Sequence, residues 1–427
     1  MDDKRQSYGE EVKESKARSL SDEDRALIKK AEQEADDRYL ANYKRNYKRR
    51  YGRKKVSRSV RFLTGSYLLM LAAFTASLIY LNMFPKTWML AIAVILAVVT
   101  AAVVMGLRSR GRKKGTRILA ALLALLLIFF YGVGTVYTFT TMSFLSATSA
   151  ENEKPVESVE DDTFHVVITG IDTEGVIDEP GRSDVNMVLT VNPRTHQLLM
   201  TSIPRDYQIS LAEHGGALDK LTHTGYYGVE STMAAEGSLL DIEPNYYVKV
   251  NFTTVRKFID AIGGIDVYSE YEFSPTNDWT VHVGTNHMNG EQALAFSRTR
   301  YAFEEGDRQR IRNQQAVFEA IFRKAVSSPS MIINYSSILS ELQDYFKMSF
   351  SPKEIRELVR KQLADNQEWR IYKSTITGGD AMMPTYSGGS QNLYVMTRDE
   401  KSLANARARI IAVMKGEEPE MHVNSKG

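Results

Sequence analysis

Three long apolar runs in the first third of the chain limit what it can fold into more than any other feature. They extend from Val60 to Leu81, from Trp88 to Leu107 and from Ile118 to Phe139. Each has about the 20 apolar residues that a helix needs to cross the hydrocarbon core of a bilayer. The sequence therefore predicts three transmembrane helices within residues 59–140, preceded by a charged tail at residues 1–58.

The charges on the connecting loops predict how these helices are oriented. The loop RSRGRKKGTR, between the second and third runs, carries six Lys or Arg and no acid, whereas NMFPKT, between the first and second, carries one Lys. Short cytoplasmic loops are enriched in Lys and Arg. We therefore expect the N-terminal tail and the second loop to be cytoplasmic, and everything after Phe139 to lie outside the cell.

The tail itself is divided by charge. SDEDRALIKKAEQEADD begins with Ser21 and Asp24 in capping-box spacing and predicts a short acidic helix. YKRNYKRRYGRKKVSR, from Tyr43 to Arg58, is purely basic. Such a run can be a solvated tail or bind nucleic acid. Beside transmembrane helices it is better interpreted as a topology determinant lying against anionic membrane lipids, so no nucleic-acid partner is expected.

The third apolar run resembles the cleavage region of a signal peptide, because it has a basic flank and is followed by FLSATSA. The run is internal and long, which favours an uncleaved anchor. Residues 141–162 are small, polar and acidic, and are interpreted as a linker.

From Thr163 to about residue 415 the pattern is that of an α/β domain, followed by a tail at 416–427. The runs FHVVITGID, DVNMVLTVN and LLMTSIP are apolar and β-branched and predict strands. NYYVKVNFTTVRKFIDAIGGIDV predicts strand, helix, turn and strand. Helices are expected near 290–300, 308–327, 330–347 and 352–364, with a strand at EWRIYKST and a last helix around KSLANARARIIAVMKG. This mixture predicts one domain with a central sheet and helices on both faces.

Composition narrows the chemistry. The 427 residues are 43% apolar, enough for a sizeable core, and the net charge of +2 predicts no partner. The absence of Cys excludes disulfides, thiol catalysis and Cys-based zinc sites. With only 7 His, none in HxH or HxxxH spacing, any metal should be an oxygen-bound hard ion such as Mg²⁺.

Two carboxylates are candidate metal ligands. Asp172 ends the first predicted strand, and GRSD opens the second with Arg182 and Asp184. Residues two apart in an extended chain share a face, so Arg182 and Asp184 should project together. The carboxylates could hold a hard cation on a phosphate, with Arg182 on the same anion. The alternative is an ordinary loop salt bridge. Arg205 and Asp206 follow the third strand, and Lys220 starts a Gly- and Tyr-rich stretch that could approach a ligand or simply lead into a helix.

The segment AFSRTRYAFEEGDRQRIRNQQ concentrates arginine. Arg298 and Arg300 precede a helix that begins near Arg308, and Arg310 lies in its first turn. A helix N-terminus favours anions, and several guanidinium groups converging there suit a phosphate. The alternative is a solvated surface on which the arginines pair with acids of the same segment. These acids are Glu304, Glu305 and Asp307.

The helix should bury the apolar stripe Ile311, Phe318, Ile321, Phe322 and Ala325. Gln314 falls on that stripe. A buried amide without a partner costs about 1–3 kcal/mol, so Gln314 should have a specific partner.

Taken together, GRSDVNMVLTVNP, LLMTSIPRD, KLTHTGYYG, YYVKVNF, AIGGIDV, HMNGEQALAFSRTR and GDRQRIRNQQ occur in the order seen in the LytR–CpsA–Psr family, which the chain resembles over about residues 164–327. The tail with three membrane helices is similar to that of its capsule-associated and Psr-like streptococcal members. The resemblance implies an α/β/α sandwich with a central mixed sheet and an apolar tunnel for a lipid.

The resemblance also implies an activity. Family members are membrane-anchored phosphotransferases of the Gram-positive cell envelope. They move a teichoic acid or capsular polysaccharide from an undecaprenyl-diphosphate carrier to peptidoglycan. By resemblance, Asp172 and Asp184 bind Mg²⁺ near the diphosphate. The residues implied to hold the phosphates are Arg182, Arg205, Lys220, Arg298, Arg300, Arg310 and Gln314, with Arg182 and Arg300 counted as catalytic together with the two aspartates.

One departure from the family pattern concerns the last motif, Asp-x-x-Arg-x-x-Arg-Gln. Asp307 and Arg310 fit it, but Asn313 replaces the second Arg, and Arg308 or Arg312 could compensate. Asp172 could accept the proton of the attacking muramyl hydroxyl or act only as a metal ligand. Two other functions stay open: a membrane-bound regulator that binds a lipid diphosphate, and a hydrolase that only cleaves one.

Overall fold

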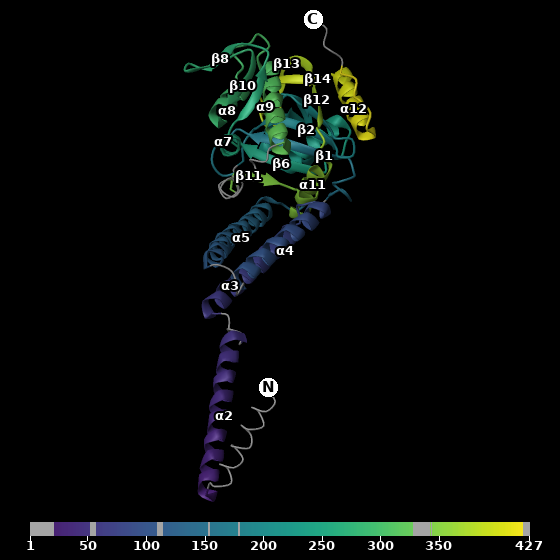
Figure 1. Ribbon diagram of the computed structural model, residues 1–427. Helices are drawn as coiled ribbons and strands as arrows, with labels where there is room; N and C mark the ends of the chain where they lie inside the picture. The colour runs from purple at the N-terminus through teal and green to yellow at the C-terminus, as the bar shows by residue number, and fades with distance from the viewer. Residues whose placement is uncertain are drawn as a thin grey trace.

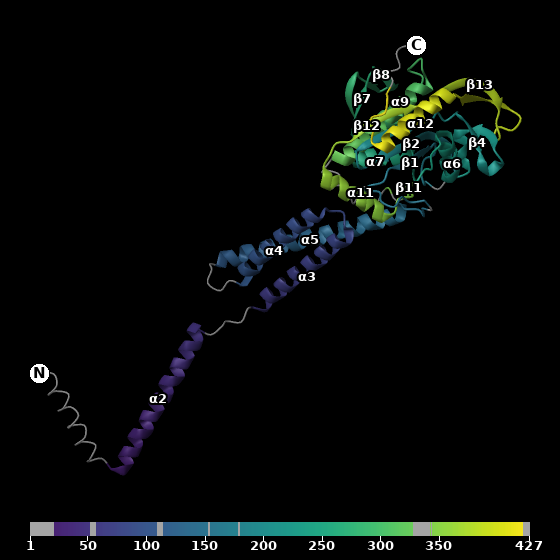
Figure 2. The same cartoon turned by 90° about the vertical axis from the view of Figure 1, so that its right-hand side faces the viewer.

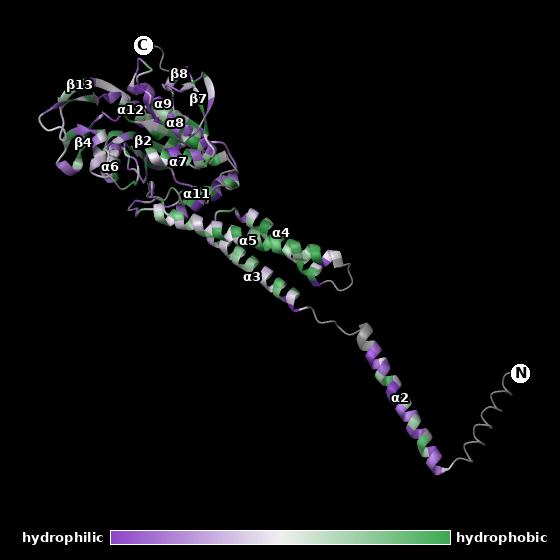
Figure 3. Cartoon of the chain, turned by 90° about the vertical axis from the view of Figure 1, so that its left-hand side faces the viewer, coloured by the Kyte–Doolittle hydropathy of each residue, from purple (hydrophilic) through white to green (hydrophobic). Residues whose placement is uncertain are grey.

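The membrane-spanning part consists of three long apolar helices, as predicted. The computed structural model describes residues 21–51, 57–108, 114–152, 154–177, 180–327, 342 and 344–421. Three of its helices are long and apolar enough to cross a membrane: α3 (Arg58–Leu81), α4 (Lys86–Arg108) and α5 (Lys114–Thr148). They lie side by side below a larger α/β domain (Figure 1). Most of their residues are hydrophobic (Figure 3), and Phe62, Leu69 and Leu119 are each at least two-thirds exposed.

The helix before them, α2 (Asp22–Tyr51), is longer than predicted. Ser21 caps it as expected, since the Ser21 hydroxyl accepts from the backbone N–H of Asp24 at 3.2 Å. The helix then continues into the basic run as far as Tyr51 instead of ending with the acidic one. Most of the loop between α4 and α5, which carries the orientation argument, lies outside the described residues.

α5 does not stop at the membrane boundary that its hydropathy suggests. Residues 141–148, expected to belong to a linker, are its last two turns. Phe144 and Leu145 from these turns are buried in the core of the α/β domain, and Ser149 bridges to Met348 directly after the helix. Apolar residues in the apparent linker therefore fasten the domain to its anchor. Arg356 adds a contact by donating to the carbonyl oxygen of Tyr80 at 2.9 Å.

A six-stranded mixed sheet forms the centre of the domain, in the order β11-β6-β1-β2-β3-β12. β1 is antiparallel to β2 and parallel to β6, while β3 is antiparallel to β2 and parallel to β12. The strands are β1 (Phe164–Ile171), β2 (Ser183–Asn192), β3 (Gln197–Ser202), β6 (Tyr246–Asn251), β11 (Phe346–Met348) and β12 (Arg370–Thr375).

Helices cover both faces of this sheet, which confirms the predicted α/β/α sandwich (Figure 2). Val166 and Leu189 face one layer, and Val167 and Val188 face the other, because successive residues of a strand point to opposite sides. The first layer contains α7 (Phe252–Ala261), α8 (Gly290–Arg298), α9 (Asp307–Ser327) and α11 (Pro352–Asp365). The second contains α6 (Val229–Leu240) and α12 (Glu400–Lys415).

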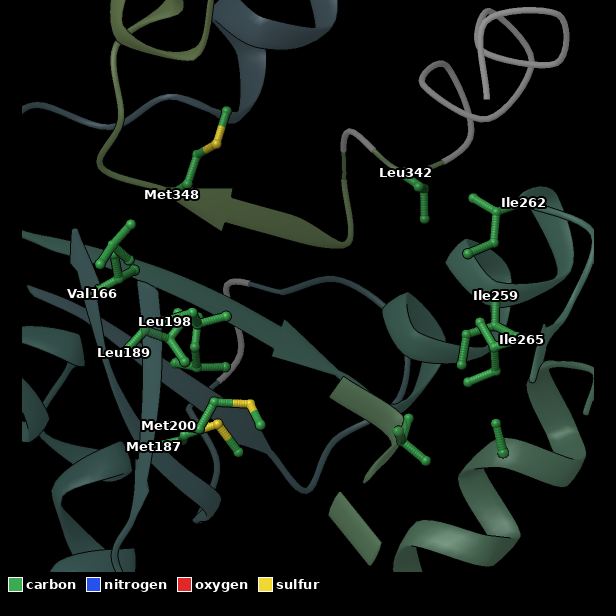
Figure 4. Packing of buried hydrophobic residues seen from close by; sticks show 14 of the residues in the cluster. Val166, Met187, Leu189, Leu198, Met200, Ile259, Ile262, Ile265, Leu342 and Met348 are labelled. Carbon is green, nitrogen blue, oxygen red and sulfur yellow. The ribbon is translucent and has the colours of Figure 1, made fainter. Parts of the chain in front are cut away.

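The first layer holds the larger core (Figure 4). Met187, Leu198 and Met200 from the sheet pack in the same cluster as Ile259 and Ile262, which belong to α7 and its C-terminal end. The described residues also form four two-stranded antiparallel sheets, which were not predicted as pairs. They are β4 (Gln208–Leu211) with β5 (Ala217–Lys220), β7 (Ile265–Ser269) with β10 (Gly284–Met288), β8 (Phe273–Thr276) with β9 (Trp279–Val281), and β13 (Gly378–Pro384) with β14 (Asn392–Arg398). The helix expected near 330–347 falls mostly outside the described residues.

Candidate phosphate and lipid site

A cavity of about 650 Å³ lies between the sheet and the first helix layer. Its wall is apolar where β1, β2 and β6 face α7, α8 and α9. The apolar lining includes Ile168, Met187, Val250, Val255, Leu294, Val317, Phe318 and Ile321. The charged residues that also line it are Asp184, Glu291, Arg298, Arg300 and Arg310, and Gln314 is among its uncharged polar residues. The cavity thus combines an apolar interior with a cluster of guanidinium groups. A lipid with an anionic headgroup has the two complementary parts.

Two of these arginines come from the end of α8. Arg298 is its last residue, and its guanidinium lies 4.4 Å from the centre of the Phe252 ring at the start of α7. Arg300 approaches the Asp307 carboxylate at 3.7 Å and lies over the exposed ring of Tyr301. Both side chains are therefore positioned by contacts with aromatic rings or a single carboxylate, and they keep hydrogen-bond donors for a ligand.

Arg310 is the most buried of the cluster, with 5% of its surface exposed. Its Nη2 donates to Asp307 at 3.1 Å, but its Nε has no hydrogen-bond partner within the described part of the chain. Burial lowers the pKa of Arg310, although Asp307 opposes the shift. An orphaned donor on a desolvated cation is costly, and an anion in the cavity would satisfy it.

Asp184 is held by Arg205, which follows β3. Arg205 Nη1 donates to both carboxylate oxygens of Asp184 at 3.0 Å. Burial alone would lower the pKa of Arg205, but the charge and hydrogen bond of Asp184, together with the charges of Asp206 and Asp307, outweigh burial and raise that pKa. Arg205 also lies 3.6 Å from Asp206, whose other oxygen accepts from Lys220 at 2.9 Å. Lys220 and Arg205 are therefore linked through Asp206, and neither lines the cavity.

Asp172 and Arg182 meet across the ends of the first two strands. The Asp172 carboxylate accepts from the backbone N–H of Arg182 at 2.8 Å, and Arg182 Nε donates to the Tyr226 hydroxyl at 3.1 Å. The bond to Tyr226 raises the pKa of Arg182, with smaller contributions from Asp172 and Asp184. Gly225 permits this approach, because a Cβ there would lie 2.2 Å from the Gly181 carbonyl oxygen.

Cations and carboxylates are thus interspersed at this end of the sheet, with three guanidinium groups lining the cavity, where a phosphate group could bind. The cations are Arg182, Arg205, Lys220, Arg298, Arg300 and Arg310, and the carboxylates are Asp172, Asp184, Asp206, Glu291 and Asp307. The arginines also pair in part with acids of their own segment: Arg300 and Arg310 with Asp307, and Arg312 with Glu305.

The donor set is compatible with Mg²⁺. No group of three or more His, Cys, Asp or Glu positioned for a metal occurs in the described part of the chain, so a metal here would have two protein carboxylates at most. Mg²⁺ commonly binds in this way, keeping water and taking its remaining ligands from substrate phosphates. Asp172 and Asp184 are the side chains that would hold it.

The structure corrects the expected faces of α9. Ile311 is buried and Phe318 and Ile321 line the cavity, but Ala325 is exposed. Gln314 is only half-buried, and its amide has no hydrogen bond to any described residue; it faces the cavity. The buried amide that does have specific partners is Gln315, which donates to the Ser202 hydroxyl and the Ser374 carbonyl, both at 2.9 Å.

Asn313 is part of the fold instead of the cavity. It is 3% exposed and donates to the Phe296 carbonyl at 3.1 Å. Arg308 and Arg312, which could have compensated for it, do not line the cavity. Arg312 instead bonds to Glu305 and Gln309. Sequence reasoning missed Tyr226, whose only signal was its place in the Gly- and Tyr-rich stretch.

Comparison with known proteins agrees with the family resemblance found in the sequence. The profile of the LytR_cpsA_psr family matches residues 133–409. The polyisoprenyl-teichoic acid--peptidoglycan teichoic acid transferase TagU of Enterococcus faecalis is 32% identical over 256 residues, which are 57% of this chain and 83% of that protein. TagU of Bacillus mycoides is 30% identical over 250 residues, 55% of this chain and 81% of that protein.

Solved structures share the same domain. A structure described as TagT bound to LIIa-WTA is 26% identical with a TM-score of 0.50, covering 62% of this chain and 97% of that one. Protein gbs0355 from Streptococcus agalactiae is 27% identical with a TM-score of 0.50, covering 64% of this chain and 94% of that one.

Proposed function

The chain belongs to the LytR–CpsA–Psr family, and from that premise we propose that it transfers an anionic glycopolymer from a polyisoprenyl diphosphate to peptidoglycan. The names of its relatives support a transferase that uses a polyisoprenyl-linked teichoic acid and peptidoglycan. The finer proposal is that the carrier is undecaprenyl diphosphate, the polymer a teichoic acid or capsular polysaccharide, and the metal Mg²⁺.

The observation that carries this proposal is the cavity that joins apolar walls to arginines. Val317, Phe318 and Ile321 suit an isoprenoid chain, and Arg298 and Arg310 at the same cavity suit its phosphates. A water-soluble phosphate ester would have no use for the apolar part, because burying apolar surface gains about 25 cal/mol per Å² only when the ligand is apolar too.

The reaction follows from this placement. A hydroxyl oxygen of the acceptor glycan attacks the phosphorus that carries the glycopolymer, and the bond from that phosphorus to the bridging oxygen breaks. The lipid monophosphate leaves, and the new bond is a phosphodiester. Phosphoryl transfer depends mainly on positioning and on stabilising charge at the phosphate oxygens. On the lipid side, the stabilising positive charge comes from Arg298, Arg300 and Arg310. Beside the carboxylates, it comes from Arg182 and Arg205.

Asp172 is the proposed acceptor of the hydroxyl proton. It is exposed, and the bond from the Arg182 backbone uses only one of its oxygens in the described structure. When bound, Mg²⁺ would neutralise the diphosphate beside Asp172 and Asp184. Full transfer by an Asp172→Asn protein would exclude this residue both as base and as ligand.

The proposed function is tested with the full-length protein in detergent micelles. A lipid-diphosphate-linked glycan and sacculi stripped of their polymer are incubated with and without Mg²⁺. Covalent attachment that requires Mg²⁺ supports the proposal. Release of a lipid monophosphate and a phosphorylated glycan without attachment would identify a hydrolase, and binding without turnover would identify a regulator.

The proposed orientation places the N-terminal tail inside the cell and the α/β domain outside. Because the chain has no Cys, single cysteines report on each side. Asn277→Cys, in the turn between β8 and β9, should react with an impermeant maleimide in whole cells, and Ala26→Cys in α2 only after lysis. The reverse pattern would overturn the orientation.

A further inference from the structure

A group of aromatic side chains lies beside Arg182 and outside the cavity. We call His214, Tyr226, Tyr227 and Tyr386 the aromatic shelf. Tyr226, Tyr227 and Tyr386 are 48%, 38% and 51% exposed. The His214 ring lies 4.8 Å from that of Tyr227 and stacks on that of Tyr386 at 4.5 Å. Tyr226 joins the shelf to the site through its hydrogen bond with Arg182. His214 thus brings the rings of Tyr227 and Tyr386 together, and Tyr226 is next to Tyr227 in the chain, so exposed aromatic side chains gather here as they do at a binding surface.

Hydrogen bonds that start at a buried carboxylate hold part of the shelf in place. Asp219 is fully buried, and its Oδ2 accepts from the Ser387 hydroxyl at 2.5 Å and from the Ser387 backbone at 3.0 Å. Ser387 in turn bonds to the Tyr227 hydroxyl at 2.9 Å and follows Tyr386 in the chain. The other oxygen of Asp219 is 2.6 Å from His223 Nδ1. The Tyr227 ring therefore loses little freedom when a ligand binds, which favours affinity.

The chemistry of the shelf suits a sugar ring. A pyranose has one face made of C–H groups, which carry partial positive charge, and the face of an aromatic ring is partially negative. Its edges carry hydroxyl and amide groups, and the shelf offers tyrosine hydroxyls at its own edges. We propose that the aromatic shelf binds the saccharide chain of the peptidoglycan acceptor. This inference rests on the proposed function.

The position of the shelf favours the acceptor over the sugar of the donor. In phosphoryl transfer the attacking and leaving oxygens lie roughly in line, on opposite sides of the phosphorus. The leaving lipid phosphate belongs to the cavity, to which Arg298, Arg300 and Arg310 contribute and Arg182 does not. The shelf is attached to Arg182, so a sugar on it would approach from the side of the attacking oxygen.

The test uses full-length protein in detergent micelles and two measurements. Calorimetry follows binding of a β-1,4-linked N-acetylglucosamine tetramer, and the transfer assay gives the KM for stripped sacculi and for the lipid donor separately. Tyr386→Leu removes a flat face while keeping apolar bulk, and should weaken tetramer binding and raise the acceptor KM by about tenfold. The kcat and the donor KM should not change. Tyr227→Leu should act in the same direction.

Matched variants make the result specific. Tyr386→Phe keeps the ring and should behave as wild type. Tyr268→Leu removes a tyrosine that is even more exposed, in β7, on the opposite side of the domain from β4 and β13 (Figure 2), and should also have no effect. Folding of each variant is checked by its thermal midpoint.

The outcomes separate this inference from the proposed function. Unchanged tetramer binding in Tyr386→Leu and Tyr227→Leu overturns the shelf and leaves transfer standing. If the donor KM rises and the acceptor KM does not, the assignment of the shelf to the acceptor is overturned. If neither the wild type nor any variant transfers polymer, but tetramer binding still depends on the rings of Tyr227 and Tyr386, the proposed function fails while saccharide binding by the shelf stands.

Discussion

Arg205 directs one nitrogen, Nη1, to both carboxylate oxygens of Asp184, at 3.0 Å from each. The pair joins the end of β3 to the start of β2, so the carboxylate at the cavity is oriented by a residue that does not line it.

We expect Arg205→Ala to lower kcat by about 10²-fold, the effect typical of losing one preorganised charged donor. Asp184 would lose its orientation, and the phosphate would lose a nearby cation. The measurement is the transfer rate at saturating donor, and Arg194→Ala, an exposed arginine in the turn after β2, is the control. A rate within about twofold of wild type would limit Arg205 to a structural role.

The hydrogen bond between Arg182 and Tyr226 gives a second expectation. Tyr226→Phe keeps the ring but removes the hydroxyl that holds Arg182 Nε. The guanidinium then becomes less ordered, and kcat should fall by about tenfold, or about 1.4 kcal/mol. The acceptor KM should stay near its wild-type value because the aromatic shelf keeps its ring. A Tyr268→Phe protein controls for loss of a tyrosine hydroxyl elsewhere.

α9 offers a matched pair for the lipid site. Ile321→Asp places a carboxylate in the apolar wall, where an isoprenoid chain cannot solvate it, so the donor KM should rise more than about tenfold. Ala325→Asp introduces the same charge one turn later at an exposed position and should leave the donor KM unchanged. Equal effects of the two substitutions would contradict lipid binding in this cavity.

Glu236 in α6 predicts a pH-dependent stability. It is fully buried, neither of its carboxylate oxygens has a hydrogen-bond partner in the described structure, and burial raises its pKa well above 4.5. Above pH 4.5 the unfolded chain therefore releases a proton that the folded chain keeps. The free energy of unfolding then falls with rising pH, by at most about 1.4 kcal/mol per pH unit from this group.

Glu236→Gln removes this decrease in the free energy of unfolding with rising pH. The variant should have a higher thermal midpoint than wild type at pH 7, and the difference should shrink toward zero as the pH approaches 4.5. Glu230→Gln, at the exposed start of the same helix, should show no such trend. A difference independent of pH would mean that Glu236 is ionised in the folded protein.

Local patterns were enough to predict the architecture. Hydropathy identified α3, α4 and α5, because a helix that crosses a bilayer must be one continuous apolar stretch of the chain. β-branched runs identified β1, β2 and β3. The boundary of α5 was wrong because its last turns are apolar for the domain core instead of for lipid, and hydropathy does not separate the two.

Within the candidate site, the sequence by itself determined the residue types and their order along the chain: two aspartates at strand ends and arginines around the start of α9. Only the tertiary structure decided their partners. Periodicity placed Gln314 on a buried stripe, but α9 packs against several elements, and it is Gln315 that is buried against Ser202 and Ser374. Asp184 meets Arg205, and Arg182 meets Tyr226, through contacts 21 and 44 residues apart along the chain. Such pairs depend on how strands and turns pack together, and no local pattern of residues encodes that packing.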